Sequence, residues 1–412
     1  MNVKSSGVLR GDLPRWTTFK WRLSHPSHDC SAAAVPLAKV DPSNNPNFVM
    51  VMVQLGPEHR VSEGKKKPFG GKPMSLTRRH VLAGSIAAPA LLKFSSAQAA
   101  TTLKISHQFP GSNGKDGDFR DILCHRFAQE LAAKSSGEMA AQVYAGSSLM
   151  KVNSQVSSLR KGALDMSLVP ISYAGGEMPE VNIGLMPALV SSYKQGLAWK
   201  QAAVGREFSK FLNDKGIVIV TWIWQAGGVA SRAAPIINPE DAKGMKIRGG
   251  SREMDLMLQA AGAAVLSLPS NELYAAMQTG ACDAGLTSST SLISFKLEEI
   301  AKHLTTGRGK SYWYMLEPLI ISKSIFDALP KKQQDLIMEV GEGLEAYGRD
   351  AAMADDEAVA KIYEKAGAKI HDLDENIVEK WRKIARETAW KDYAGKNAGS
   401  AKLLQLAESV PA

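Results

Sequence analysis

Residues 245–283 read MKIRGGSREMDLMLQAAGAAVLSLPSNELYAAMQTGACD. The apolar pattern predicts a strand over Met245–Arg248 and a helix over Arg252–Ala261. A second strand over Val265–Leu268 and a second helix over Asn271–Thr279 follow. Strands that alternate with helices in this way favour layers of helices on a parallel sheet. The stretch therefore predicts that the fold class is α/β.

The end of this stretch has a counterpart earlier in the chain. Gly280-Ala281-Cys282-Asp283 follows a predicted helix, and so does Gly162-Ala163-Leu164-Asp165, after a helix near Ser154–Lys161. In each case the glycine caps the helix in left-handed geometry and a strand begins at once. In the earlier copy that strand runs over Leu164–Val169. We interpret the repetition as two similar α/β lobes with a crevice between them.

The N-terminal lobe begins with a strand over Thr102–Ser106 and a helix from about Asp118, which Gly137 ends. A strand near Ala140–Tyr144 follows. The run Gly216–Trp224 is continuously apolar, as in a strand buried on both faces.

The C-terminal part contains one more predicted strand, over Tyr312–Ser322. A long helical pattern starts near Pro330 and runs past Ala360, and a final helix spans about Glu375–Trp390. A helix as long as the first of these is able to brace both lobes. The roughly 310 residues after position 100 are also enough for two domains.

Residues 74–100 have the three parts of a bacterial export signal. Arg78 and Arg79 form the basic start, Val81–Leu92 the apolar core and Ala97-Gln98-Ala99 the small-residue exit. The paired arginines indicate the twin-arginine route. The apolar core is too short for a bilayer, which takes about 20 residues. A short buried helix is the alternative, and the small-residue exit argues against it. We expect export to the periplasm.

Residues 1–73 show no sustained helical or strand period. We interpret them as a mis-called start, with translation beginning at Met74, and a disordered extension is the alternative.

Residues 1–100 contain 14 Lys and Arg against 5 Asp and Glu, so they account for the whole net charge of +9. The rest of the chain is neutral, with 36 of each sign. A nucleic-acid partner inferred from net charge is thereby excluded.

Motifs of catalysis and of metal binding are missing from the sequence. There is no Gly-x-Ser-x-Gly elbow, no phosphate loop and no dinucleotide fingerprint. The histidines after position 100 have no metal-ligand spacing; they are His107, His125, His303 and His371. We therefore predict no enzyme, no catalytic residue, no metal and no cofactor. Cys124 and Cys282 are able to pair in an oxidising compartment, and small core residues are the alternative.

Two arginines are candidates for binding an anion. Arg248 ends a predicted strand, and in α/β sheets the carboxyl ends of strands open into the ligand crevice. A guanidinium there grips a carboxylate through two parallel hydrogen bonds. Arg232 lies just beyond the predicted strand that ends at Trp224. For both arginines, a solvated turn is the alternative.

Three segments resemble the DctP-type solute-binding proteins of tripartite ATP-independent periplasmic (TRAP) transporters. They are Ser231–Arg248, Leu268–Ala284 and Tyr144–Asp165, and the resemblance covers residues 101–370. It implies the two-lobed periplasmic binding protein fold, an interlobe ligand cleft and a long bracing helix. It also implies that the cleft closes on a small organic acid anion, which the small and large permease subunits then receive. We expect a monomer.

The resemblance assigns roles to individual residues. Arg248 matches the arginine that pairs with the ligand carboxylate, and Arg232 matches a second cleft arginine. Ser270 and Thr287 fall where members of the family contact ligand. We also include His107 and Gln108, in the loop after the first strand, among the ligand-binding candidates.

Aromatic residues gather near the predicted cleft: Trp222, Trp224, Tyr312, Trp313 and Tyr314. We count Trp224 as a ligand-binding candidate, and core packing is the alternative for the whole set. Thr287 stands where sugar-acid and dicarboxylate binders of the family often place an asparagine. We therefore predict an aromatic or other bulky monocarboxylate as the ligand. The alternatives are a C4-dicarboxylate, a 2-oxo acid, or a ligand-sensing module for a signalling receptor.

The predicted division of the chain places residues 101–229 and 315–355 in lobe I. Residues 230–314 and 356–412 form lobe II.

Overall fold

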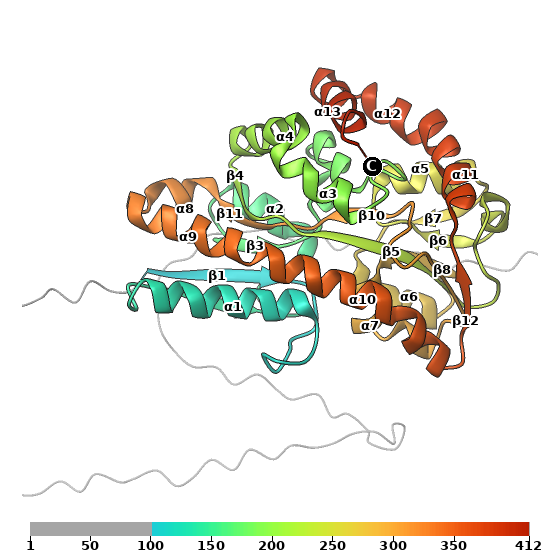
Figure 1. The fold of residues 1–412 in the computed structure, drawn as a ribbon, viewed down its shortest axis with the longest axis horizontal. Coiled ribbons are helices and arrows are strands. Elements are labelled where there is room, and N and C mark those ends of the chain that lie inside the picture. The colour runs from blue at the N-terminus through green and yellow to red at the C-terminus, as the bar shows by residue number, and fades with distance from the viewer. Residues whose placement is uncertain (1–100, 412) are drawn as a thin grey trace, which may run out of the picture. The chain divides into compact units, whose positions relative to one another are not determined.

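The computed structural model describes residues 101–411 (Figure 1). The extension predicted over residues 1–73 and the export signal predicted over 74–100 lie outside the described residues. In the described part, no helix combines the length and the apolar character that crossing a membrane takes. Two β-sheets, one in each lobe, organise the chain.

The sheet of lobe I has the strand order β2-β1-β3-β11-β4. Its strands are Thr101–His107 (β1), Met139–Tyr144 (β2), Met166–Leu168 (β3), Ile217–Thr221 (β4) and Leu319–Ser322 (β11). β1 runs parallel to β2 and β3, whereas β11 is antiparallel to β3 and β4. The predicted strands near Thr102–Ser106 and Ala140–Tyr144 are confirmed.

The sheet of lobe II has the order β12-β9-β5-β8-β6-β7, with β10 paired to β5. Its strands are Trp224–Ser231 (β5), Lys246–Arg248 (β6), Ala264–Leu266 (β7), Ala284–Ser288 (β8), His303–Thr306 (β9), Tyr314–Leu316 (β10) and Lys369–Asp372 (β12). β6 is parallel to both β7 and β8, so the α/β unit predicted over residues 245–283 is confirmed. β5 is antiparallel to β8.

Helices cover both sheets (Figure 1). Those before β10 are Phe119–Lys134 (α1), Val152–Arg160 (α2), Tyr193–Ala198 (α3), Ala203–Asp214 (α4), Arg252–Ala260 (α5), Leu273–Gln278 (α6) and Ser289–Ser294 (α7). Those after β11 are Lys323–Ala328 (α8), Lys331–Gly343 (α9), Glu345–Lys365 (α10), Glu375–Ala385 (α11), Lys391–Ala394 (α12) and Ala398–Glu408 (α13).

Local signals explain where several helices begin and end. α1 begins after Asp118, whose carboxylate caps it by accepting a hydrogen bond from the backbone N–H of Arg120. α2 and α6 are each followed by a glycine with positive φ, +69° at Gly162 and +76° at Gly280. A side chain would strain the backbone there, so both glycines end their helices as predicted.

The predicted strand over Gly216–Trp224 is wrong as a single element. β4 ends at Thr221, and β5 begins at Trp224 in the other sheet. Between them the backbone N–H of Trp222 donates to the Glu345 carboxylate at 3.1 Å, in place of a strand partner. The apolar run is continuous because both strands are buried, so the composition does not reveal the change of sheet.

The predicted strand over Tyr312–Ser322 is likewise two strands. β10 pairs with β5 in lobe II, and β11 pairs with β3 and β4 in lobe I. The break falls at Glu317 and Pro318. Proline has no N–H to donate, which makes it unsuited to the middle of a sheet. The chain thus crosses between the lobes at β4–β5 and at β10–β11, and α10 later leads it back to β12 of lobe II.

The long helical pattern that was predicted from Pro330 forms α9 and α10, which divide at Leu344. α10 contacts α1 of lobe I and also contacts α7, β9 and β12 of lobe II. It therefore braces both lobes (Figure 1), as predicted. The predicted helix over Glu375–Trp390 is α11 followed by one π-helical turn, and α12 and α13 lie beyond it.

The predicted lobe boundaries remain a proposal, because the C-terminal helices contact both lobes. α11 contacts α5 of lobe II, whereas α13 contacts α4 of lobe I.

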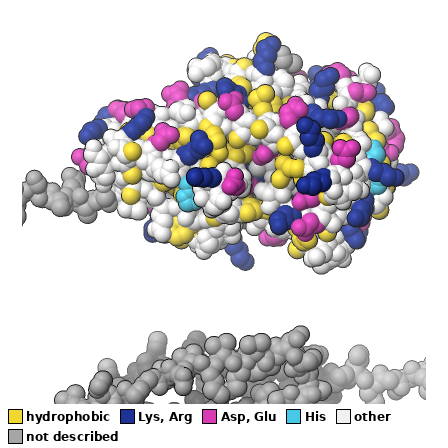
Figure 2. Space-filling view, turned by 60° about the horizontal axis from the view of Figure 1, so that its bottom comes forward, with side chains coloured by type: hydrophobic (Ala, Val, Ile, Leu, Met, Phe, Trp, Pro, Cys, Tyr) yellow, Lys and Arg dark blue, Asp and Glu magenta, His cyan; other side chains and the backbone are white. Residues whose placement is uncertain are grey.

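Cys124 and Cys282 are both buried and are not bonded to each other. On the face that Figure 2 shows, basic and acidic side chains are interspersed, as the balance of charges after residue 100 predicts.

Candidate functional site

A small cavity lies where the two lobes meet. It has an empty volume of about 210 Å³. Lobe II and the crossing strands supply most of its lining: Arg248, Gly250, Ser270, Thr287, Ser291, Trp313, Met315 and Glu317. The segment after β3 supplies the remainder: Pro170, Tyr173 and Leu185. Three predicted ligand-binding residues, Arg248, Ser270 and Thr287, therefore line one cavity.

Arg248 is the one cation among the lining residues. It ends β6 and is 2% exposed. Its Nε donates to the Leu268 carbonyl at 3.0 Å, and Nη1 donates to the Leu286 carbonyl at 2.7 Å. These two bonds fix the guanidinium plane from both neighbouring segments. The guanidinium carries more N–H groups than its protein partners use, so it retains donors for an anion.

Tyr173 joins the two lobes at this point. It lies in the 3₁₀ helix Ile171–Ala174 (η2), which contacts α2 of lobe I. Its hydroxyl accepts a hydrogen bond from Nη2 of Arg248 at 2.9 Å and one from the backbone N–H of Ser270 at 3.0 Å. A single oxygen of lobe I thus receives two donors of lobe II, which are the kinds of donor that bind a carboxylate oxygen.

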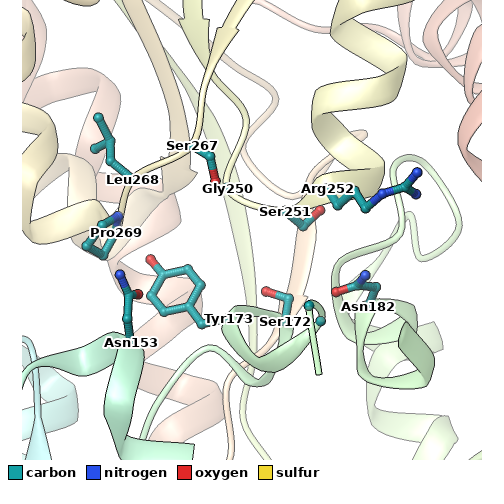
Figure 3. Close-up of a pocket in the computed structure, with 12 residues that line it drawn as sticks. Asn153, Ser172, Tyr173, Asn182, Gly250, Ser251, Arg252, Ser267, Leu268 and Pro269 are labelled. Atoms are coloured by element: carbon teal, nitrogen blue, oxygen red, sulfur yellow. The ribbon is translucent and has the colours of Figure 1, made fainter. Parts of the chain in front are cut away.

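An outer cleft of about 820 Å³, open to solvent, shares Tyr173 and Gly250 with the inner cavity. In Figure 3, Asn153, Ser172 and Tyr173 face Ser251, Leu268 and Pro269 across it. Ser251 caps α5 by accepting from the Met254 N–H, and its hydroxyl donates to the Leu185 carbonyl at 3.1 Å. The outer cleft is therefore lined by residues of both lobes and lies next to the inner cavity.

A buried charge network lies beside the inner cavity. Arg120 of α1 is fully buried and donates to the Asp118 carboxylate at 2.8 and 2.6 Å. Its Nη1 donates to Glu317 at 3.1 Å and to the Ser291 hydroxyl at 3.1 Å. Glu317 and Ser291 both line the cavity, so Arg120 links the helix of lobe I to the ligand site. Although burial lowers the pKa of Arg120, the two carboxylates raise it above its ordinary value.

Glu317 lies in the β10–β11 crossing and is completely buried. Its Oε2 accepts hydrogen bonds from Arg120 and from the side-chain amide of Gln225. Its Oε1 has no hydrogen-bond partner among the described residues. Burial raises the pKa of Glu317, and the guanidinium of Arg120 opposes that rise. The cavity lining therefore includes one guanidinium, that of Arg248, and the buried carboxylate of Glu317.

Two other predicted ligand-binding residues, His107 at the end of β1 and Trp224 at the start of β5, are buried in the core. Trp224 packs edge-on against Trp199, with ring centroids 5.0 Å apart, and is 2% exposed. His107 is fully buried; its Nε2 lies 2.9 Å from the Asp121 carboxylate and its Nδ1 accepts from the Phe109 N–H. The structure does not bring either residue to the cavity lining.

Gln108 and Arg232 also lie away from the cavity lining. Gln108 is 1% exposed. Arg232 follows β5, and its backbone N–H donates to the Asp283 carbonyl just before β8 begins. Thr287 stands near the other end of β8. Arg232 thus lies beyond the start of β8, and of the two arginines only Arg248 is among the lining residues.

The aromatic residues near the cleft divide between core and site. Trp313 lines the cavity, and its Nε1 donates to the Gly249 carbonyl at 3.3 Å. Tyr312 stacks on Trp381 at 4.9 Å, and Tyr314 packs edge-on against Tyr193 at 5.4 Å. Core packing thus explains these two tyrosines.

Sequence reasoning missed Tyr173 and Glu317. Tyr173 comes four residues after the predicted strand that ends at Val169, so the rule that selected Arg248 applies to it as well. Glu317 is the one charged residue inside the apolar run Tyr312–Ser322 and it precedes a proline. A lone charge in such a run is costly to bury and marks a function or a break.

The site has the parts of a binding site for a small anion. Within residues 101–411, His, Cys, Asp and Glu side chains form no group of three that is suited to hold a metal ion. The lining combines a buried guanidinium, small hydroxyls from Ser270 and Thr287, and an indole wall from Trp313. Such a lining fixes a carboxylate and leaves little space around it.

A buried carboxylate beside the outer cleft gives a prediction for stability. Glu253, in the first turn of α5, is fully buried, and burial raises its pKa from 4.5 to about 7. The folded protein therefore holds this proton more tightly than the unfolded chain does. We expect the free energy of unfolding of the wild type to fall as the pH rises from 4.5 to about 7. In Glu253→Gln the same rise in pH should lower it by a smaller amount. At pH 8 the variant should be more stable by about 1–3 kcal/mol.

Urea unfolding between pH 4 and 8 measures this effect. Asp255, whose pKa burial raises to about 7 as well, leaves part of the slope in the Glu253 variant. The exposed Glu364→Gln on α10 is the matched control and should keep the wild-type slope. Equal slopes in wild type and Glu253→Gln would rule the prediction out.

A family model and the relatives of known sequence identify the same family. Residues 114–396 match the family model described as bacterial extracellular solute-binding protein, family 7. A solute-binding protein of Albidiferax ferrireducens is 61% identical over 338 residues, which cover 81% of this chain and 100% of that protein. The 2,3-diketo-L-gulonate-binding periplasmic protein YiaO of Escherichia coli is 25% identical over 62% of this chain and 78% of its own length.

Solved structures agree with these relatives. A TRAP periplasmic solute-binding protein from Rhodoferax ferrireducens, with bound malonate, has a TM-score of 0.74 and 63% identity. The match covers 75% of this chain and 98% of that one. DctP7 of Bordetella pertussis, an extracytoplasmic solute receptor binding pyroglutamic acid, has a TM-score of 0.67 at 22% identity, over 75% of this chain and 100% of its own. That likeness concerns the fold.

Proposed function

The chain belongs to family 7 of the bacterial extracellular solute-binding proteins, and on this premise we propose that it captures a compact organic carboxylate for a TRAP transporter. The family consists of transport solute-binding proteins, not of enzymes. The observation that carries the proposal is Arg248, a buried guanidinium with N–H donors to spare in an interlobe cavity. A guanidinium in such a place pairs with a carboxylate by two parallel hydrogen bonds.

The size of the cavity supports a compact ligand over a bulky aromatic acid. The inner cavity has about 210 Å³, and Tyr173 and Trp313 wall it. The Rhodoferax ferrireducens relative, whose structure contains malonate, points to the same size of ligand. A C4-dicarboxylate or a short monocarboxylate fits this description, and an aromatic acid needs the lobes farther apart.

Capture proceeds by closure of the lobes. The open protein admits the anion, Arg248 takes its carboxylate, and the lobes rotate about the β4–β5 and β10–β11 crossings. Hydrogen bonds from Arg248 and Ser270 to Tyr173, and from Arg120 to Ser291, support this closing motion because they join the lobes. The closed form is what the small and large permease subunits recognise in the periplasm. Export by the twin-arginine route places the protein there.

A thermal-shift panel of small organic acids tests the proposal. Ligand at about 100 times its Kd stabilises the folded state by about 2.7 kcal/mol, so the cognate acid should raise Tm by about 5–10 °C. Neutral analogues, such as the corresponding amides, serve as controls and should give no shift. Recovery of the acid unchanged after denaturation separates a binder from an enzyme. A panel in which no carboxylate raises Tm would contradict the proposal.

A further inference from the structure

The inner cavity contains a second polar group that the carboxylate does not explain. Glu317 lines the cavity that Arg248 lines, is 0% exposed, and keeps its Oε1 without a hydrogen-bond partner among residues 101–411. A buried carboxylate oxygen without a donor is costly, because it has lost its water and gained nothing in return. In the bound state a ligand group that donates a hydrogen bond would remove this cost.

The other contacts of Glu317 fix which of its atoms is available. Oε2 accepts from Arg120 at 3.1 Å and from Gln225, so these two donors hold one oxygen in place. The partners of Glu317 are themselves buried: Arg120 is 0% and Gln225 is 1% exposed. The carboxylate of Glu317 is therefore held in place by buried partners, in a residue that lines the cavity.

The charges around Glu317 favour a ligand that presents a hydrogen-bond donor to this carboxylate. Arg120 contacts two carboxylates, Asp118 and Glu317, so the network has an excess of negative charge beside the cavity. Arg248 supplies the positive group of the same cavity. A ligand that fits both ends carries a carboxylate for Arg248 and a hydrogen-bond donor for Glu317.

From this geometry we propose that Glu317 is a specificity-determining residue, and that the ligand is a small hydroxy acid whose hydroxyl donates to Oε1 of Glu317. The inference rests on the proposed function and narrows its ligand class. A 2-oxo acid of the same size is rejected, because its carbonyl oxygen has no proton to donate and meets the carboxylate oxygen lone pair to lone pair. An unsubstituted acid binds between these two, since it neither donates nor repels.

Isothermal titration calorimetry with ligand pairs of matched size tests the inference in the wild-type protein. Lactate and pyruvate differ at one oxygen, and hydroxymalonate and malonate differ by one hydroxyl. A hydrogen bond to a charged group predicts about 10- to 100-fold tighter binding for the hydroxy acid of each pair. Equal affinity within both pairs, or preference for pyruvate over lactate, overturns the inference.

The variant Glu317→Gln tests the residue itself. The carboxamide keeps the size and still accepts from Arg120, but it offers an N–H₂ to the cavity. The lactate-to-pyruvate affinity ratio should therefore fall at least about tenfold, because the carbonyl of pyruvate gains a donor. The ratio is taken within one variant, so a loss of folded protein cancels. An unchanged ratio in Glu317→Gln also overturns the inference.

Glu345→Gln is the matched control. Glu345 is a partly buried carboxylate near the β4–β5 crossing, where it accepts from Trp222 and Lys200, and it does not line the cavity. Its variant should keep the wild-type ratio, and a fall equal to that of Glu317→Gln would show a nonspecific effect and overturn the inference. If no acid of either kind binds the wild type, the proposed function itself fails. If acids bind through Arg248 without regard to the hydroxyl, only the inference fails.

Discussion

The variant Arg248→Ala is expected to bind the cognate carboxylate about 30- to 4,000-fold more weakly than the wild type. The reason is that a carboxylate enclosed by the closed lobes loses its charged partner, a loss that costs about 2–5 kcal/mol. Arg248 is 2% exposed, so water does not replace it. Calorimetry with the best acid from the thermal-shift panel gives the two dissociation constants directly.

Arg232→Ala is the matched control for this prediction. The sequence marks both arginines as candidates, but the structure places Arg232 after β5, next to Asp283 and outside the cavity lining. Its variant should bind as tightly as the wild type. Arg248 also donates to the carbonyls of Leu268 and Leu286, so unfolding without ligand must be measured alongside. Wild-type affinity in a folded Arg248→Ala protein would end the claim that this guanidinium holds the carboxylate.

Most elements of the fold follow from local signals. Asp118 caps α1, and Gly162 and Gly280 end α2 and α6, because these residues satisfy or relax the backbone within one turn. The strand partner of a residue is set at long range and leaves no such mark. The continuous apolar run over Gly216–Trp224 contains parts of two strands, which belong to two different sheets.

The candidate site could be predicted in part, for a related reason. Arg248 ends β6, which is parallel to both of its neighbours, so the rule of carboxyl ends applies to it. Arg232 follows β5, which is antiparallel to β8, so the end of that strand points away from the crevice. Strand direction is therefore what separates the two arginines. The charge of Glu317 and the proline after it mark a break in the apolar run, but the sequence does not show that the two halves join different sheets.

Replacing Arg120 by methionine should strongly destabilise the folded protein. The fully buried guanidinium compensates two buried carboxylates, those of Asp118 and Glu317. Removal of one partner from a buried ion pair leaves an uncompensated charge and costs about 3–5 kcal/mol. Methionine fills much of the same volume, so the loss reports on charge and hydrogen bonds and not on a cavity. Guanidinium chloride unfolding measures the difference in free energy of unfolding.

A second variant on the same helix distinguishes the stability effect of the buried network from that of an exposed ion pair. Lys134 of α1 forms a salt bridge of 2.8 Å with Glu339, at 44% and 65% exposure of the two side chains. Because water and salt screen exposed pairs, Lys134→Met should leave the free energy of unfolding nearly unchanged. Adding Glu317→Gln to Arg120→Met should cost less than the sum of the single effects, since it removes one of the charges left unpaired. Additive effects, or a cost for Arg120→Met no larger than that for Lys134→Met, would mean that Arg120 does not stabilise the contact between α1 and the ligand site.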